Sequence, residues 1–255
     1  MVVFGMESLM TKNFLATLAP LRQIALVVLP APPAYSFTTL YRPNPLIVSP
    51  SSVAELAASH HIPVVYLVNW HELSRYLPSN MPIVVCCFPR KLPEWLCASP
   101  CFNVHPSLLP MLRGPDPLFY TARGDAPAGI TIHRIDSSFD TGPIVWQQAI
   151  ETQHCTDESS YIAYHAHVAA QHFLDDAIFS FSAQPQSAAT VSFAPLPKAA
   201  DYNLHATWSQ QRIRRFIQCT NLRNHPYWVP HMQCWVESLS DAVRIGVSCS
   251  DGILT

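Results

Sequence analysis

The sequence is poor in charge and in glycine, and it has no long hydrophobic run. Asp, Glu, Lys and Arg make up 13% of its 255 residues, and the formal net charge is −2. Binding to a polyanion usually requires an excess of Lys and Arg on one face, so this balance gives no support for nucleic acid binding. The longest apolar runs, residues 24–30 and 62–68, have the length of strands and are too short to span a membrane.

Several common motifs are missing as well. The eight cysteines form no CxxC pair, which favours a reducing compartment over a disulfide scaffold. The absence of GxGxxG and of a Walker loop counts against a dinucleotide or a nucleoside triphosphate as the main ligand. The first residues do not combine a basic region, an apolar stretch and a small-residue cleavage site. We therefore expect no export signal and a cytoplasmic protein.

The sequence is instead rich in apolar residues, 49% of the chain, in short runs that alternate with helix-like segments. Continuous rather than alternating apolar strands predict an α/β fold with a mostly parallel sheet and helices on both faces. The expected strands are residues 2–4, 24–29, 62–68, 82–88, 101–104, 129–136 and 143–150. The expected helices are near 7–18, at 51–60 with a capping-box start at Ser51 or Ser52 and Glu55, and at 157–181.

The composition also divides the chain into two parts. Residues 183–192 contain mostly small residues, Gln and Ser, which is typical of a linker. We therefore predict a main domain over residues 1–190 and a small C-terminal subdomain over 191–255. The subdomain should contain a helix at 208–221 and two or three strands within 227–239 and 241–255.

The stretch FNVHPSLLPMLRG, residues 102–114, follows the apolar start of a predicted strand. Asn103 and His105 lie two residues apart, so in an extended segment their side chains share one face. An amide and an imidazole at a strand's carboxyl end can polarise a carbonyl and move a proton, which are two parts of an acyl-transfer site. An equally weighted alternative is that both satisfy local backbone groups. Four of the seven glycines, between Gly114 and Gly142, predict tight turns nearby.

Asp140 lies in IDSSFDTGP, downstream of this stretch. A carboxylate near an imidazole favours its charged form and fixes its orientation. The alternative is an ordinary turn-forming aspartate, because Asp with Ser and Gly is common turn chemistry. The histidines at 165, 167 and 172 lie on a predicted helix without a third ligand at suitable spacing, so we predict no metal site.

Two blocks, NVHPSLLPMLRG and GITIHRIDSSFDTGPIV, resemble the folate-dependent formyltransferases. That family includes methionyl-tRNA formyltransferase, the amino-sugar N-formyltransferases and glycinamide ribonucleotide formyltransferase. The resemblance covers about residues 1–190 and implies a Rossmann-like domain that uses 10-formyltetrahydrofolate as formyl donor. Carried over residue by residue, it implies a catalytic trio of Asn103, His105 and Asp140.

The resemblance also implies two binding surfaces. The acceptor would contact Ser8, Ser107 and Arg113. One departure from the family is Ser138, which replaces a glycine of the aspartate loop and would cost energy if the backbone needs a positive φ there. The folate would lie against Phe88, Pro89, Arg90, Leu92, Ile135, Asp136, Ser137 and Ser138.

The nature of the acceptor amine is a separate question. We favour a small amine, such as a nucleotide-linked amino sugar, over methionyl-tRNA. The transfer-RNA enzyme of the family has a basic, glycine-rich loop after its second strand and a full C-terminal barrel. Here the corresponding loop, from Pro30 to Pro45, holds one arginine and no lysine or glycine. The part after the linker is too short for a closed five-stranded barrel. Methionyl-tRNA formyltransferase, a formyltetrahydrofolate hydrolase and a non-catalytic folate-binding relative stay open as alternatives. The sequence does not determine the oligomeric state.

Overall fold

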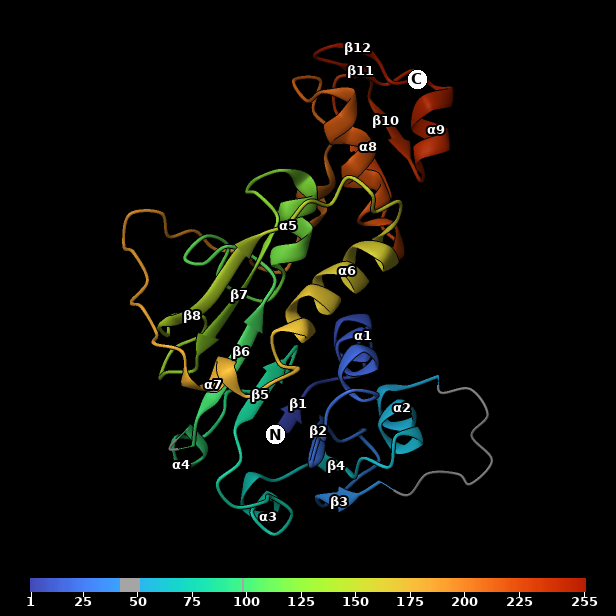
Figure 1. The fold of residues 1–255 in the computed structure, drawn as a ribbon. Coiled ribbons are helices and arrows are strands. Elements are labelled where there is room, and N and C mark those ends of the chain that lie inside the picture. Colours follow the sequence, from blue (N-terminus) through green and yellow to red (C-terminus); the bar gives the residue numbers. More distant parts are fainter. Residues whose placement is uncertain (42–50, 98) are drawn as a thin grey trace.

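The computed structural model describes residues 1–41, 51–97 and 99–255, and its main feature is an eight-stranded sheet (Figure 1). The strand order is β3-β4-β2-β1-β5-β6-β7-β8. The strands are β1 (Val2–Phe4), β2 (Leu26–Pro30), β3 (Thr39–Leu40), β4 (Val64–Leu67), β5 (Ile83–Cys86), β6 (Cys101–His105), β7 (Gly129–Arg134) and β8 (Ile144–Ala149). Neighbours among β1, β2, β4, β5 and β6 run parallel, whereas β3, β7 and β8 are antiparallel to theirs. The predicted mostly parallel sheet is confirmed, with a hairpin of β7 and β8 at one edge.

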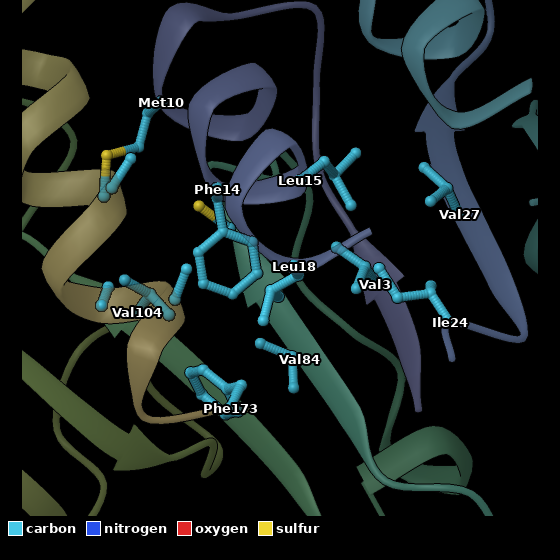
Figure 2. Packing of buried hydrophobic residues seen from close by; sticks show 14 of the residues in the cluster. Val3, Met10, Phe14, Leu15, Leu18, Ile24, Val27, Val84, Val104 and Phe173 are labelled. Carbon is cyan, nitrogen blue, oxygen red and sulfur yellow. The ribbon is translucent and has the colours of Figure 1, made fainter. Parts of the chain in front are cut away.

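Helices cover both faces of the sheet. Successive strand residues point to opposite sides, so apolar strands present side chains for helices to pack on at each face. Val3 of β1 packs with α1 (Leu9–Leu18), α2 (Val53–Ser59) and α6 (Glu158–Gln171), as Figure 2 shows for the α1 contacts. Its neighbours Val2 and Phe4 pack on the other face with α3 (Trp70–Leu73) and α4 (Glu94–Cys97). Phe14 of α1 is fully buried, and burial of such a side chain is worth about 1.5–3 kcal/mol.

The helix starts follow local capping signals. Ser52 and Glu55 form the predicted capping box of α2. The expected single helix over 157–181 is wrong: α6 ends at Gln171, and a short α7 (Ala177–Ser180) follows. The physical reason is Asp175, whose carboxylate accepts the N–H of Ala177 at 2.7 Å, a local contact that competes with continuous helix.

The C-terminal part contains α8 (Gln210–Gln218), α9 (Leu239–Arg244) and the short hairpins β9 (Tyr227–Val229)–β10 (Cys234–Val236) and β11 (Ser248–Cys249)–β12 (Gly252–Ile253). The helix expected at 208–221 is confirmed as α8. Residues 241–255 were expected as a strand but begin inside α9, because Ser238 caps that helix by accepting the N–H of Asp241 at 3.2 Å.

An aromatic pair and a set of ion pairs are among the contacts that join the C-terminal part to the rest of the chain. Phe216 of α8 packs edge-to-face on Phe119 of α5 (Pro117–Arg123), with ring centroids 5.3 Å apart. Arg223 forms ion pairs with Asp116 and Glu158. The division into 1–190 and 191–255 stays a prediction. Among the described residues no helix is long and apolar enough to cross a bilayer, and all eight cysteines are free thiols.

Candidate active site

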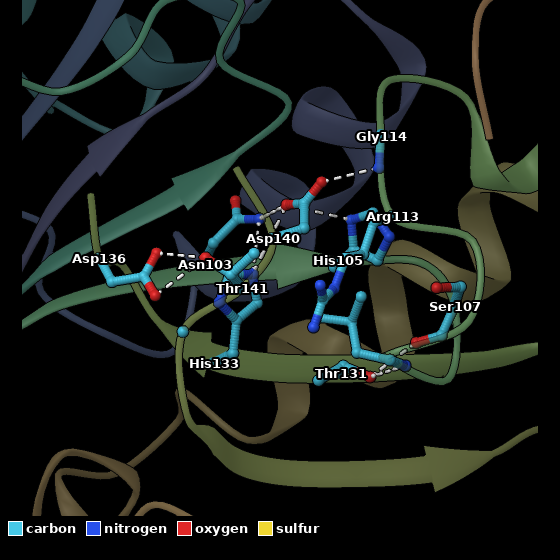
Figure 3. A network of polar contacts seen from close by, with 12 residues as sticks. Asn103, His105, Ser107, Arg113, Gly114, Thr131, His133, Asp136, Asp140 and Thr141 are labelled. Atoms are coloured by element: carbon cyan, nitrogen blue, oxygen red, sulfur yellow. Dashed lines mark hydrogen bonds and ion pairs between the residues drawn. The ribbon is translucent and has the colours of Figure 1, made fainter. Parts of the chain in front are cut away.

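Asn103, His105 and Asp140 meet at the carboxyl end of β6 (Figure 3). Nδ2 of Asn103 donates to Oδ1 of Asp140 at 3.2 Å, and Nδ1 of His105 lies 3.5 Å from the same oxygen. Asp140 reaches them from the loop after β7 because β6 and β7 are paired neighbours in the sheet. The structure thus brings together the three side chains of the predicted catalytic trio, whose roles stay a prediction.

The environment of His105 defines its protonation state. The side chain is almost completely buried, and Nε2 lies 2.8 Å from the carbonyl oxygen of Leu112, so Nε2 carries a hydrogen. Burial lowers the pKa of His105 below 6.5, although Asp140 and the Leu112 carbonyl oppose the shift. His105 is therefore neutral near pH 7, with Nδ1 free to take a proton beside the carboxylate of Asp140.

Asp140 supplies the negative charge of the site from a constrained backbone. Its φ is 56°, in the left-handed region, and its Oδ2 accepts the N–H of Gly114 at 2.9 Å. Burial alone would raise the pKa of Asp140, but the rings of His133 and His105 and the Gly114 N–H bring that pKa below 3.8. The carboxyl group is consequently ionised at neutral pH.

His133 is a site residue that the sequence interpretation missed. It lies opposite Asn103 in the β6–β7 register and is 2% exposed. Its Nδ1 donates to the carbonyl oxygen of Arg134 at 2.8 Å, so the lone pair of Nε2 accepts from Nδ2 of Asn103 at 3.1 Å. His133 therefore helps to fix the direction of the Asn103 amide. The signal was the polar pair Thr131 and His133, at i and i+2 in an apolar strand.

The aspartate loop does not need a glycine at Ser138. The left-handed residue among the described loop residues 135–141 is Asp140, whereas Ser138 donates its N–H to Asp136 Oδ1 at 3.1 Å. The required glycine is Gly142, because a Cβ there would lie 1.8 Å from the carbonyl oxygen of Arg134. Ser138 therefore does not carry the conformational energy cost that a positive φ would impose on a serine.

The residues expected to bind folate fall into two groups. Leu92, Asp136 and Ser137 line a cavity of about 300 Å³ together with Lys91, Glu94 and Cys97. Two others pack against protein side chains. Phe88 packs edge-to-face on Phe4, and the Arg90 guanidinium lies 4.9 Å from the centroid of the Trp70 ring. Pro89 is exposed, and the backbone N–H of Ile135 donates to Cys101 at 3.0 Å. A cavity of about 630 Å³ at residues 19–25 and 60–63 lies before the amino ends of β2 and β4, whereas the candidate site lies at the carboxyl end of the parallel strand β6.

The residues expected to contact the acceptor are all engaged with protein groups. Ser8 caps α1 by accepting the N–H of Thr11 at 3.2 Å. Ser107 is fully buried and donates to the carbonyl oxygen of Met111 at 2.8 Å. Arg113 donates to Gln186 through Nε at 3.1 Å and Nη2 at 2.6 Å. No group of three or more His, Cys, Asp or Glu side chains suited to a metal ion occurs in the described part of the chain.

Comparison with known sequences relates this chain to formyl transferases. Residues 71–178 match the family model described as formyl transferase. The methionyl-tRNA formyltransferase of Fervidobacterium nodosum is 30% identical over 174 residues, 64% of this chain and 54% of that protein. The methionyl-tRNA formyltransferase of Thermotoga maritima is 33% identical over 111 residues, 40% of this chain and 36% of that protein. The chain thus spans about a third to a half of the length of these curated relatives.

Comparison with solved structures shows the same fold. The sugar 3N-formyltransferase WlaRD, solved with dTDP and 5-N-formyl-tetrahydrofolate, aligns with a TM-score of 0.60 at 16% identity, over 93% of this chain and 84% of that chain. The N-formyltransferase of Helicobacter canadensis, solved with folinic acid and dTDP-3-aminofucose, gives a TM-score of 0.58 at 15% identity, over 86% and 79%.

Proposed function

We propose, from its similarity to formyl transferases in sequence and in fold, that this chain transfers a formyl group from 10-formyltetrahydrofolate to the amine of a small metabolite. The observation that carries the proposal is the meeting of an amide, an imidazole and a carboxylate at the end of β6. These are the groups that acyl transfer to an amine needs: a donor for an oxyanion, a proton carrier and an orienting charge.

The transfer forms one bond and breaks one. The lone pair of the acceptor amine attacks the formyl carbon, and the formyl oxygen becomes an oxyanion. When this intermediate collapses, the bond to N10 of the folate breaks, N10 takes a proton, and the acceptor nitrogen loses one. Asn103 donates an N–H to the oxyanion after giving up its contact with either His133 or Asp140. His105 carries the proton at Nδ1, and Asp140 stabilises the resulting imidazolium.

The donor site is supported by the cavity beside the aspartate loop. Its wall combines the apolar Leu92 with the polar Asp136 and Ser137, a combination suited to a flat ring system with hydrogen-bonding edges. The same loop carries Asp140 only a few residues further on. Folate in this cavity would therefore lie on a loop that also holds the carboxylate of the proposed catalytic trio.

A small acceptor is supported by the charge balance. The net charge of −2 offers little attraction to a polyanion. The proline-rich loop at residues 30–45, with its single arginine, also favours a small acceptor. The structure describes residues 30–41 of this loop, and 42–45 lie outside the described residues. The second candidate is a methionyl-tRNA acceptor, because the curated relatives named above are methionyl-tRNA formyltransferases.

The test is a turnover assay with purified protein and 10-formyltetrahydrofolate, with and without a panel of amines that includes dTDP- and UDP-linked amino sugars. Release of tetrahydrofolate that depends on the amine is the expected result. Formate release without any amine would instead identify a hydrolase. Folate binding without either product would identify a non-catalytic binding protein.

A separate experiment decides between the two acceptors. Gel shifts with methionyl-tRNA across a salt series should show no tight binding, and methionyl-tRNA should not stimulate release of tetrahydrofolate. Tight binding that weakens steeply with salt, accompanied by formylation, would replace the small amine by transfer RNA.

A further inference from the structure

We propose that Gln186, held by Arg113, is a positioning residue that fixes the backbone of Asp140 so that its carboxylate faces His105. This role rests on the proposed function, since it concerns the same trio. Gln186 lies in residues 183–192, which the sequence identified only as a linker.

The amide of Gln186 is hydrogen-bonded at both of its ends. Nε2 donates to the carbonyl oxygen of Asp140 at 2.9 Å and to that of Gly142 at 2.8 Å. Oε1 accepts from Nε and Nη2 of Arg113 at 3.1 and 2.6 Å. Both amide hydrogens and the amide oxygen are therefore used, which fixes the orientation of the group.

The Gln186 hydrogen bonds lie at a position where the backbone conformation is unfavourable. Asp140 has φ 56°, and a residue other than glycine pays about 1–2 kcal/mol for the left-handed region. The carboxylate of Asp140 accepts from the Gly114 N–H and from Asn103, but that same carboxylate must also face His105. The backbone anchor from Gln186 leaves the carboxylate free for that task.

Arg113 is itself held in place by the segment that carries Gln186. Its N–H donates to the carbonyl oxygen of Ser192 at 2.9 Å, and its carbonyl oxygen accepts from Ala194 at 2.7 Å. At the other end, Gln184 and Ile144 exchange backbone hydrogen bonds at 2.7 and 2.8 Å. Residues 184–194 thus connect the loop after β6, which follows His105, to the loop after β7, which carries Asp140.

A different role for the same residues would leave a different kinetic signature. If Arg113 and Gln186 bound the acceptor, losing Gln186 would raise KM for the amine and leave kcat nearly unchanged. If Gln186 positions Asp140, the loss lowers kcat and leaves KM for the amine nearly unchanged. A misplacement of about 1 Å in a catalytic constellation can lower the rate by about 100-fold.

The experiment compares Gln186→Leu with Gln184→Leu, a matched control two residues away whose side chain is exposed. Both proteins are assayed for kcat and KM, and thermal unfolding checks that each is folded. For Gln186→Leu we expect kcat to fall by up to about 100-fold, and by no more than in Asp140→Asn, with little change in KM, and for Gln184→Leu no change in either. A rise in KM at unchanged kcat, or wild-type values for Gln186→Leu, would overturn the proposal.

A second readout needs no turnover. The ionisable side chains that face His105 are Asp140, which raises the pKa of the ring, and His133, which lowers it. The His105 titration is followed by NMR on protein with labelled histidine, with the signal assigned by its loss in His105→Gln. Gln186→Leu should lower the pKa of His105 and Gln184→Leu should not. If the wild type shows no formyl transfer, the proposed function fails, but this titration still decides whether Gln186 positions Asp140.

One further variant covers the case in which Gln186→Leu does not fold. Gln186→Glu keeps an oxygen for Arg113 but places a second carboxylate oxygen against the carbonyl groups of Asp140 and Gly142. The positioning role requires kcat to fall in this variant as well, with KM for the amine nearly unchanged. A wild-type kcat in folded Gln186→Glu would contradict it.

Discussion

His105 at the end of β6 and His165 in the middle of α6 are both almost inaccessible to solvent, with exposed fractions of 3% and 0%. Each lies 2.8 Å from a backbone carbonyl oxygen through one ring nitrogen, that of Leu112 or that of Tyr161. The second ring nitrogen differs. In His105 it faces Asp140 at 3.5 Å, whereas in His165 it has no hydrogen-bond partner among the described residues.

Burial alone favours the neutral form of a histidine, whereas a carboxylate beside the buried ring favours its protonated form. Burial lowers the pKa of His165 to about 4, so this ring stays neutral through the physiological range. Burial also lowers the pKa of His105, but Asp140 opposes that shift. A proton that arrives on His105 meets a charge that stabilises it, whereas a proton on His165 would be isolated in the interior.

The largest expected effect is the loss of His105. In His105→Ala, kcat should fall by about 10²–10⁴-fold, because general acid–base assistance is typically worth that much. The matched control is His165→Gln, which should keep kcat near the wild-type value, since His165 is buried in α6 against Tyr161 of the same helix. Steady-state release of tetrahydrofolate measures both. Full activity in folded His105→Ala would remove His105 from the mechanism.

Part of the fold and of the candidate site could be predicted from the sequence. The strands and the polar residues on them were predictable, because apolar runs and the i, i+2 spacing of Asn103 and His105 are local patterns. The break of the predicted helix at Gln171 was not, since it depends on one side chain competing with the backbone. The contribution of His133 required the β6–β7 register, and the contacts of Gln186 required the path of residues 184–194 across the site. The spacing of Thr131 and His133 marks a polar face of the strand, but the partners of His133 and Gln186 are set by the tertiary structure.

The second prediction concerns stability as the pH is lowered. The pKa of His165 is about 4 in the folded protein against 6.5 for an ordinary histidine, so the unfolded chain takes up the proton first. The stability that this ring contributes is fully present above pH 6.5 and is lost as the pH falls toward 4. The loss is at most about 3 kcal/mol.

Denaturant unfolding at pH 7, 5.5 and 4.5 measures this effect. His165→Gln should lose less stability over that range than the wild type, because glutamine does not titrate. His105 contributes in the same direction in both proteins, so the difference between them isolates His165. Identical pH dependence in the two proteins would show that folding does not lower the pKa of His165.

The third prediction removes the Asp140 carboxylate, so that the surroundings of His105 resemble those of His165. Asp140→Asn keeps the size of the side chain, but the pKa of His105 should fall because the charge that raises it is gone. Hydrogen bonds to a charged group are worth about 1.5–3 kcal/mol, so kcat should fall by about 10- to 100-fold. NMR titration and kinetics measure the two quantities. An unchanged pKa of His105 would mean that Asp140 does not govern it.

The smallest expected effect lies in the exposed part of the aspartate loop. Thr141 donates to Oδ1 and Oδ2 of Asp136 at 2.7 and 2.9 Å, and Thr141→Val removes this contact while leaving Asp140 beside His105. A net hydrogen bond is worth about 1 kcal/mol, so KM for the folate should rise by about fivefold. Both kcat and the pKa of His105 should stay constant. A fall in kcat for Thr141→Val would show that the folate side of the loop and Asp140 are one coupled unit.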